Sequence, residues 1–116
     1  MELNEKVKML CDAAADKKAK DITVIDISKM SVIADKFIIC SAQSAAQVKA
    51  ICDNIEEKLK QQNQEIIRID GYDEARWIVV DLSDILVHIF KEEDRIFYNL
   101  EHLWNNGENT FVYTEK

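Results

Sequence analysis

The chain has 116 residues, of which 47% are hydrophobic and 32% charged, and its formal net charge is −7. This length supports one domain with a substantial core and leaves no room for a second. An acidic chain is repelled by a phosphate backbone, which disfavours primary recognition of DNA or RNA, whereas a basic protein would be attracted.

Targeting and redox features favour a cytoplasmic protein. No apolar run approaches the roughly 20 residues that a membrane-spanning helix needs, and the first ten residues, MELNEKVKML, lack the apolar block of a signal peptide. Cys11, Cys40 and Cys52 are odd in number and lie within apolar patterns. We therefore expect these cysteines to be small buried hydrophobic residues and not a disulfide framework.

The first half of the chain predicts two helices and two strands. Apolar residues recur every three or four positions over residues 3–19 and about 44–62, which indicates two amphipathic helices. Ser44 and Gln47 fit a capping box at the start of the second helix. Runs of β-branched and apolar residues predict strands over Ile22–Ile27 and Lys36–Cys40.

Three further strands are expected in the second half, over Glu65–Ile69, Trp77–Leu82 and Ile85–Phe90. Asp70-Gly71 is a turn pair that tolerates positive φ. The two strands around Ser83 are too close for a crossover connection, so they form an antiparallel hairpin.

A final helix is expected over about residues 95–104, with Asp94 as its cap. Thr110–Thr114 either adds a strand or belongs to a tail covering about residues 105–116. The residues expected on the buried side of the helix are Ile96, Phe97, Leu100, Leu103 and Trp104.

This order of elements predicts a single mixed α/β domain over residues 1–116, with a sheet of about five strands. The strand at Lys36–Cys40, the helix after it and the strand at Glu65–Ile69 form a β-α-β unit, which favours parallel pairing of these two strands.

The hairpin presents two unlike faces, because successive side chains of a strand point to opposite sides. One face is wholly aliphatic and belongs to the core. The other combines aromatic residues with a carboxylate and an imidazole, a composition typical of protein interfaces. The mixed face therefore either binds a partner or lies beneath the final helix. The aliphatic face consists of Ile78, Val80, Leu82, Ile85, Val87 and Ile89, and the mixed face of Trp77, Val79, Asp81, Leu86, His88 and Phe90.

No residue pattern indicates an enzyme, a metal site or a cofactor. The histidines are isolated, and Cys40, a conceivable nucleophile beside His88, ends an apolar run where a thiol is usually inert. Asp81 and Asp84 flank a turn, whereas a two-metal nucleotidyl-transfer site places two carboxylates one residue apart on a strand. We expect Asp84 to bond backbone amides of the turn instead.

Several blocks of sequence carry a family resemblance. They are residues 18–22 with Asp26, residues 35–40, residues 44–47, Ala50-Ile51, residues 77–84, residues 87–90, Arg95, Tyr98, Leu100-Glu101 and Leu103-Trp104. On these residues the chain resembles the Iojap family, the bacterial ribosomal silencing factors, over nearly its whole length. It departs from the family pattern at three turns: Ser83 stands where glycine is usual, Ala42 where Thr-Gly is common, and Asp70-Gly71 where Glu-Gly is usual.

The resemblance implies a nucleotidyltransferase-like fold without catalytic residues. It also implies binding to large-ribosomal-subunit protein L-fourteen, at the face that meets the small subunit. Occupying that face would block subunit joining and repress translation under nutrient limitation or in stationary phase. Two alternatives stay open: a large-subunit assembly factor, as organellar members of the family imply, and a residual nucleotidyltransferase.

The expected contact surface is the mixed face together with Asp84. Trp77 and Phe90 would be apolar anchors, and the aspartates would meet Lys or Arg of the partner. Contacts with rRNA would be secondary, and no membrane is involved. A homodimer in isolation would use either an exposed apolar face of the hairpin or the terminal segment Thr110–Thr114. The partner-binding residues expected are Trp77, Val79, Asp81, Asp84, Leu86, His88 and Phe90. Arg95, Tyr98 and Glu101 are weaker contact candidates, because pinning the last helix to the sheet would equally account for them.

Overall fold

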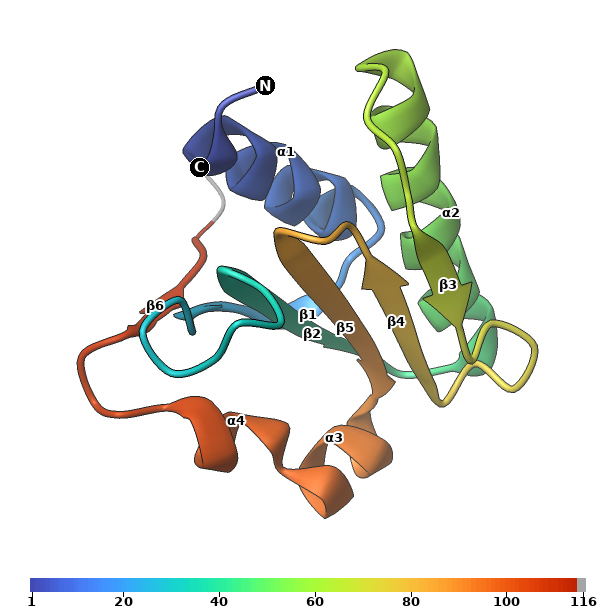
Figure 1. Ribbon diagram of the computed structural model, residues 1–116. Helices are drawn as coiled ribbons and strands as arrows, with labels where there is room; N and C mark the ends of the chain where they lie inside the picture. The colour runs from blue at the N-terminus through green and yellow to red at the C-terminus, as the bar shows by residue number, and fades with distance from the viewer. Residues whose placement is uncertain (115–116) are drawn as a thin grey trace.

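The structure, a computed structural model, describes residues 1–114. Within these residues a six-stranded mixed sheet lies between two layers of helices, with α1 and α2 on one face and α3 and α4 on the other (Figure 1). The strands lie in the order β3-β4-β5-β2-β1-β6. The elements are α1 (Leu3–Asp16), β1 (Lys20–Asp26), β2 (Lys36–Ala42), α2 (Ala45–Gln61), β3 (Arg68–Asp70), β4 (Trp77–Asp81), β5 (Ile85–Lys91), α3 (Glu92–Tyr98), α4 (Leu100–Trp104) and β6 (Thr110–Val112).

The centre of the sheet is a parallel pair, β2 with β5, and its other strand pairs are antiparallel. The predicted parallel pairing of β2 with β3 is wrong, because the β4–β5 hairpin lies between them. β3 is three residues long and two of them, Arg68 and Asp70, are exposed. Such a strand suits an edge, whereas β5 supplies the apolar side chains that a centre buried on both faces needs.

The aliphatic face of the hairpin forms the larger core, as predicted, together with β1, β2 and the two long helices. The stripe of α2 that packs on it consists of Val48, Ile51, Cys52, Ile55 and Leu59. Ser44 caps this helix by accepting from the Gln47 amide at 3.1 Å, and the Gln47 side chain accepts from the Gln43 amide at 3.0 Å. The predicted capping box is therefore confirmed, with Gln43 as the second donor.

The predicted final helix is divided in two. Asn99 adopts a left-handed conformation, with φ of +45°, and separates α3 from α4. The helical period therefore does not continue across residue 99, and the predicted buried stripe is only partly correct. Leu100 and Trp104 pack against the sheet, but Ile96, Phe97 and Leu103 are 79%, 79% and 71% exposed.

The start of this region also differs from the prediction. α3 begins at Glu92, three residues before the expected start, and Asp94 lies inside it. The carboxylate of Asp94 is buried and accepts from Arg76 Nε at 3.2 Å, so it ties α3 to the segment before β4 instead of capping a helix.

We expected Asp84 to hold the β4–β5 turn, and this prediction is wrong, because Asp81 holds it. Asp81 Oδ1 accepts from the Ser83 amide at 2.9 Å, whereas the Asp84 carboxylate pairs with the buried Lys6 of α1 at 3.1 Å. An Asp84 amide bond to the Leu82 carbonyl at 3.0 Å closes a γ-turn around Ser83, whose φ is +75°. This conformation favours glycine, which has no Cβ to strain it.

The C-terminal segment contributes an edge strand. β6 pairs antiparallel with β1, so Thr110–Val112 of the predicted strand or tail are part of the sheet. Residues 115–116 of the predicted tail lie outside the described residues.

Gly71 and Gly107 allow a matched test of backbone packing, because both have positive φ, +81° and +90°. A Cβ on Gly71 would lie 2.3 Å from the Trp77 carbonyl oxygen, whereas one on Gly107 would meet nothing within 4 Å. We expect Gly107→Ala to lower the free energy of unfolding by about 1 kcal/mol and Gly71→Ala by about 3 kcal/mol, measured by urea denaturation. Equal losses would show that the β3–β4 turn can move away from Trp77.

Candidate functional site

The mixed face of the hairpin is only partly open. Phe90 is fully buried and His88 is 5% exposed, so neither offers a surface to a partner. Trp77, Val79 and Leu86 are partly buried, and each retains some accessible surface. Burial therefore holds for Phe90 and His88, whereas partner binding stays a prediction for Trp77, Val79 and Leu86. Phe90 and His88 lie under the terminal helices, and the part of the mixed face formed by Trp77, Val79 and Leu86 stays accessible. We call this part the open end of the mixed face.

Asp81 and Asp84 do not act together. Asp81 lies on the mixed face, opposite Arg68 of β3, and its Oδ2 is 3.8 Å from Arg68 Nη2. Asp84 extends toward α1 on the other side of the sheet, where it pairs with Lys6. The two carboxylates therefore cannot hold one metal ion between them, and Asp84 lies away from Trp77.

Trp77 is held at the edge of an aromatic cluster. Its ring stacks on Phe90, with centroids 4.8 Å apart, and lies 4.9 Å from the ring of Tyr98 in α3. Its indole Nε1–H donates to His88 Nδ1 at 3.1 Å. Such pairs are worth about 0.5–1.5 kcal/mol beyond area burial, so this cluster joins α3 to the hairpin.

A cleft of about 540 Å³ opens beside Trp77, between the β3–β4 connection and α3. We call it the Trp77 cleft. One wall is aromatic and exposed, and the other carries the Arg76–Asp94 ion pair. The same wall carries the Glu74 carboxylate, which pairs with no cation among residues 1–114. An aromatic surface with an acidic rim suits an apolar or cationic group of a partner. The lining residues are Gly71, Glu74, Arg76, Trp77, Asp94, Phe97 and Tyr98.

Sequence reasoning missed Phe97 as an accessible residue, because it continued one helix through residue 99, and it gave Tyr98 only as a weaker contact candidate. Asn99 is the signal that could have revealed this exposure, since asparagine is enriched in the left-handed region. With the break at Asn99, the exposed apolar side chains of α3 and α4 become a feature of the surface and not of the core.

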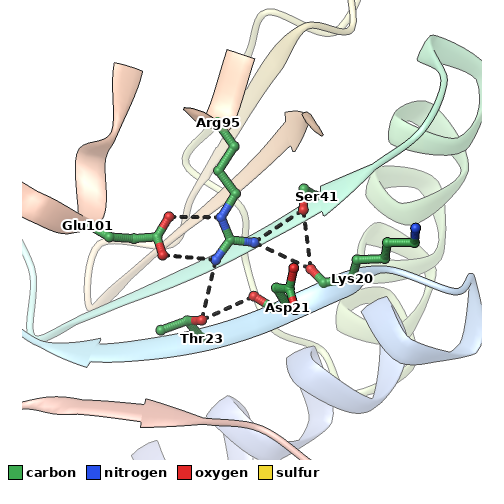
Figure 2. A network of polar contacts seen from close by, with 6 residues as sticks. All are labelled: Lys20, Asp21, Thr23, Ser41, Arg95 and Glu101. Atoms are coloured by element: carbon green, nitrogen blue, oxygen red, sulfur yellow. Dashed lines mark hydrogen bonds and ion pairs between the residues drawn. The ribbon is translucent and has the colours of Figure 1, made fainter. Parts of the chain in front are cut away.

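Arg95 fastens α3 and α4 to the sheet, as the sequence suggested, and Figure 2 shows its contacts. Its guanidinium forms a bidentate pair with Glu101 of α4, at 2.8 and 3.1 Å. The other N–H groups donate to Ser41 Oγ at 3.2 Å, the Lys20 carbonyl at 3.3 Å and Thr23 Oγ1 at 3.3 Å. Because all five donors are used and the side chain is 11% exposed, Arg95 is a structural clamp and not a ligand-binding group.

The cysteines and histidines show no catalytic arrangement. Burial raises the pKa of Cys11, Cys40 and Cys52 to about 12, so they remain inert thiols at neutral pH. Cys40 faces the larger core, whereas His88 contacts Phe37 on the other side of the sheet, so the two cannot form a nucleophile–base pair. Among residues 1–114 no group of three or more His, Cys, Asp or Glu side chains could hold a metal ion.

No helix within the described part of the chain combines the length and the apolar character that crossing a bilayer requires.

His88 is a neutral imidazole in the folded protein. Burial lowers its pKa from 6.5 to about 4. Because Nδ1 accepts from Trp77, the proton of the neutral ring is on Nε2. Within the described residues, this buried Nε2 has no hydrogen-bond partner.

The Arg95 clamp predicts a large effect of a substitution that keeps its charge. Arg95→Lys loses the bidentate fork and at least two further bonds, so we expect the free energy of unfolding to fall by about 2–3 kcal/mol. Arg68→Lys is the matched control, because its pair with Asp70 is exposed on both sides, and we expect a change within about 0.5 kcal/mol. Similar small losses in both variants would contradict a structural clamp.

His88 also predicts a pH dependence of stability. Because its pKa is lower in the folded state, stability is fully present above pH 6.5 and is lost as the pH falls toward 4, by about 3 kcal/mol in total. Urea denaturation of wild type and His88→Phe at several pH values measures this loss, which the variant should lack. Asp26 acts in a separate window, since its pKa falls from 3.8 to about 2 when Ser28 donates to it. Identical slopes for both proteins above pH 4.5 would contradict the assignment.

Comparison with known proteins gives consistent matches over nearly the whole chain. The family model described as "Ribosomal silencing factor during starvation" matches residues 1–115. Ribosomal silencing factor RsfS of Bacillus subtilis is 40% identical over 107 residues, which cover 90% of this chain and 91% of that protein. A Chromobacterium violaceum crystal structure superposes with a TM-score of 0.89 at 31% identity, covering 99% of this chain and 95% of that one.

A more distant relative is the mouse protein named "Mitochondrial assembly of ribosomal large subunit protein 1". It is 29% identical over 101 residues, which cover 84% of this chain and 44% of that protein. The resemblance inferred from the sequence blocks is confirmed: the chain belongs to the ribosomal silencing factor (RsfS, Iojap) family.

Proposed function

We propose that this chain binds the large ribosomal subunit through ribosomal protein L-fourteen and blocks joining of the small subunit, without catalysing a reaction. The site of action would be the cytoplasm, where translating ribosomes form. Family membership supports the ribosomal role. The observation that carries the proposal is the Trp77 cleft, an accessible aromatic surface with an acidic rim.

The docking surface that we propose consists of the Trp77 cleft and the open end of the mixed face. It offers Trp77 and the exposed Phe97 as anchors, and Val79 and Leu86 as neighbouring apolar area. Large aromatic side chains dominate the binding energy of many interfaces. Phe90 and His88 would support this surface from below, since both are buried. Asp84 is left out, because its carboxylate pairs with Lys6 on the other side of the sheet.

Charge favours a basic protein as the occupant. The docking surface carries three carboxylates, Glu74, Asp81 and Asp94, against one guanidinium, Arg76, which pairs with Asp94. Acidic groups therefore predominate on it, on a chain with a net charge of −7. Such a surface attracts the Lys and Arg side chains of a ribosomal protein and is repelled by the surrounding rRNA phosphates. Electrostatics would therefore select the protein component and help to fix its orientation.

The size of the domain is sufficient for steric exclusion. Its principal extents are 34 × 34 × 30 Å. Subunit bridges require surfaces of the two subunits to approach to contact distance, a few ångströms. A rigid domain of this thickness on the intersubunit face would keep the small subunit out of contact without any conformational change.

A role in large-subunit assembly is the second candidate, and the name of the mouse relative favours it. Both roles would use the same docking surface, so they differ in timing and not in contacts. Precursor particles that accumulate in a deletion strain would favour assembly. Normal particles, with excess joined ribosomes in stationary phase, would favour silencing.

The docking surface can be tested by subunit joining. Purified subunits are mixed under associating conditions with increasing amounts of the protein, and joined ribosomes are measured by sedimentation. We expect the wild type to reduce joining, and Trp77→Ala and Phe97→Ala to raise the concentration needed by about thirtyfold or more, the loss typical of interface hot spots.

Phe111→Ala is the matched control, because Phe111 is an exposed aromatic residue on the distant β6 edge. Phe97 is 79% exposed, so its substitution leaves the fold intact even if Trp77→Ala does not. Full joining in the presence of saturating wild-type protein would refute the proposed function. Equal effects of Phe97→Ala and Phe111→Ala would refute the proposed surface.

A further inference from the structure

The hydrogen bond between Trp77 and His88 crosses from one strand to the next. In the β4–β5 register, Trp77 lies opposite Phe90, and His88 lies opposite Val79. The Trp77 indole therefore reaches diagonally along the mixed face, with its ring stacked on Phe90 and its Nε1–H directed to His88 Nδ1 at 3.1 Å. Stacking on Phe90 fixes the plane of the indole ring, and the hydrogen bond to His88 fixes the direction of its N–H group.

His88 is an unfavourable residue for its place in the core. It is 5% exposed, packs edge-on against Phe37 at 4.6 Å, and lies beside Phe90. Its Nε2–H is buried with no acceptor among residues 1–114, so this donor has lost its water without replacement. An aromatic hydrocarbon side chain such as phenylalanine would fill similar space without this loss. Packing alone therefore does not explain a histidine here.

We propose that His88 is a positioning residue for Trp77: it accepts the indole N–H and holds the ring in the orientation that forms the wall of the Trp77 cleft. This inference rests on the proposed function only for its effect on binding. The orientation itself is a property of the free protein.

The orientation limits what a partner can find at Trp77. Because the indole N–H donates to the buried His88 and the ring contacts Phe90 and Tyr98, the accessible part of the indole offers ring carbon atoms and no hydrogen-bond donor. The complementary group is then apolar, such as the methylene stem of a Lys or Arg side chain of a basic protein. Without His88, the N–H could turn outward and the ring would sample other rotamers.

Two substitutions separate the acceptor from the packing. His88→Phe keeps a ring and removes the acceptor, and His88→Asn places an amide oxygen near the position of Nδ1 and removes the ring. The indole ¹H–¹⁵N resonance of Trp77 in the free protein reports the bond, with Trp104→Phe used for assignment. We expect hydrogen exchange of this proton to accelerate at least about tenfold in His88→Phe, the factor for losing a bond of roughly 1.4 kcal/mol, and to stay near the wild-type rate in His88→Asn.

Thermal unfolding at pH 7.5 completes the comparison. We expect the melting temperature of His88→Phe to be unchanged or higher, because the buried unpaired donor is gone. Equal exchange of the Trp77 indole proton in wild type and His88→Phe would overturn the proposal. So would a lower melting temperature in His88→Phe accompanied by unchanged exchange, since His88 would then be a packing residue.

Binding to the large subunit provides the functional readout. We expect His88→Phe to weaken binding by about fivefold to tenfold, the value of one hydrogen bond, and His88→Asn to retain more affinity. If Trp77→Ala abolishes binding but His88→Phe does not weaken it, positioning is refuted while the proposed function stands. If Trp77→Ala binds normally, the proposed surface fails, and the exchange measurement still decides how the indole is held.

Discussion

The structure depends on covering the sheet face opposite α1 and α2, and only two short helices, α3 and α4, are available to cover it. β2 and β5 are apolar on both sides, so the sheet needs a cover opposite α1 and α2, and that cover is two helices of seven and five residues. Helices this short are not stable alone in water. Arg95 supplies what they lack, because its five donors connect both helices to β1 and β2. The aromatic cluster around Trp77 and Phe90 adds apolar contacts between these helices and the sheet.

Local sequence patterns predicted most of the fold, since they depend only on neighbouring residues. Alternation along the strands predicted the aliphatic face, the helical period predicted the stripe of α2, and the capping motif predicted its start at Ser44. The place of β3 could not be predicted, because strand order is decided by non-local competition for the buried centre. Our prediction assigned the turn bond to Asp84, but Asp81 makes it and Asp84 pairs with Lys6, since the γ-turn at Ser83 sets which carboxylate faces the turn amides.

The candidate site was predictable in composition but not in exposure. The sequence indicated that aromatic and charged residues share one face of the hairpin, and they do. Which of them stay accessible depends on how far the final helices extend, and this is decided at Asn99. A single residue in the left-handed region therefore places Phe97 and Leu103 in solvent and leaves Leu100 and Trp104 to cover Phe37.

The two edges of the sheet have a consequence for self-association. β3 and β6 are three residues each, and β3 carries exposed charges on two of them. Unpaired backbone groups at a sheet edge are templates for adding further strands, and proteins limit this hazard by short, charged edges. A neighbouring chain that docked here would find few amides and carbonyls to pair with. Short edges therefore disfavour pairing with an arbitrary extended peptide, and we expect discrimination between partners to come from the side chains on the faces of the domain.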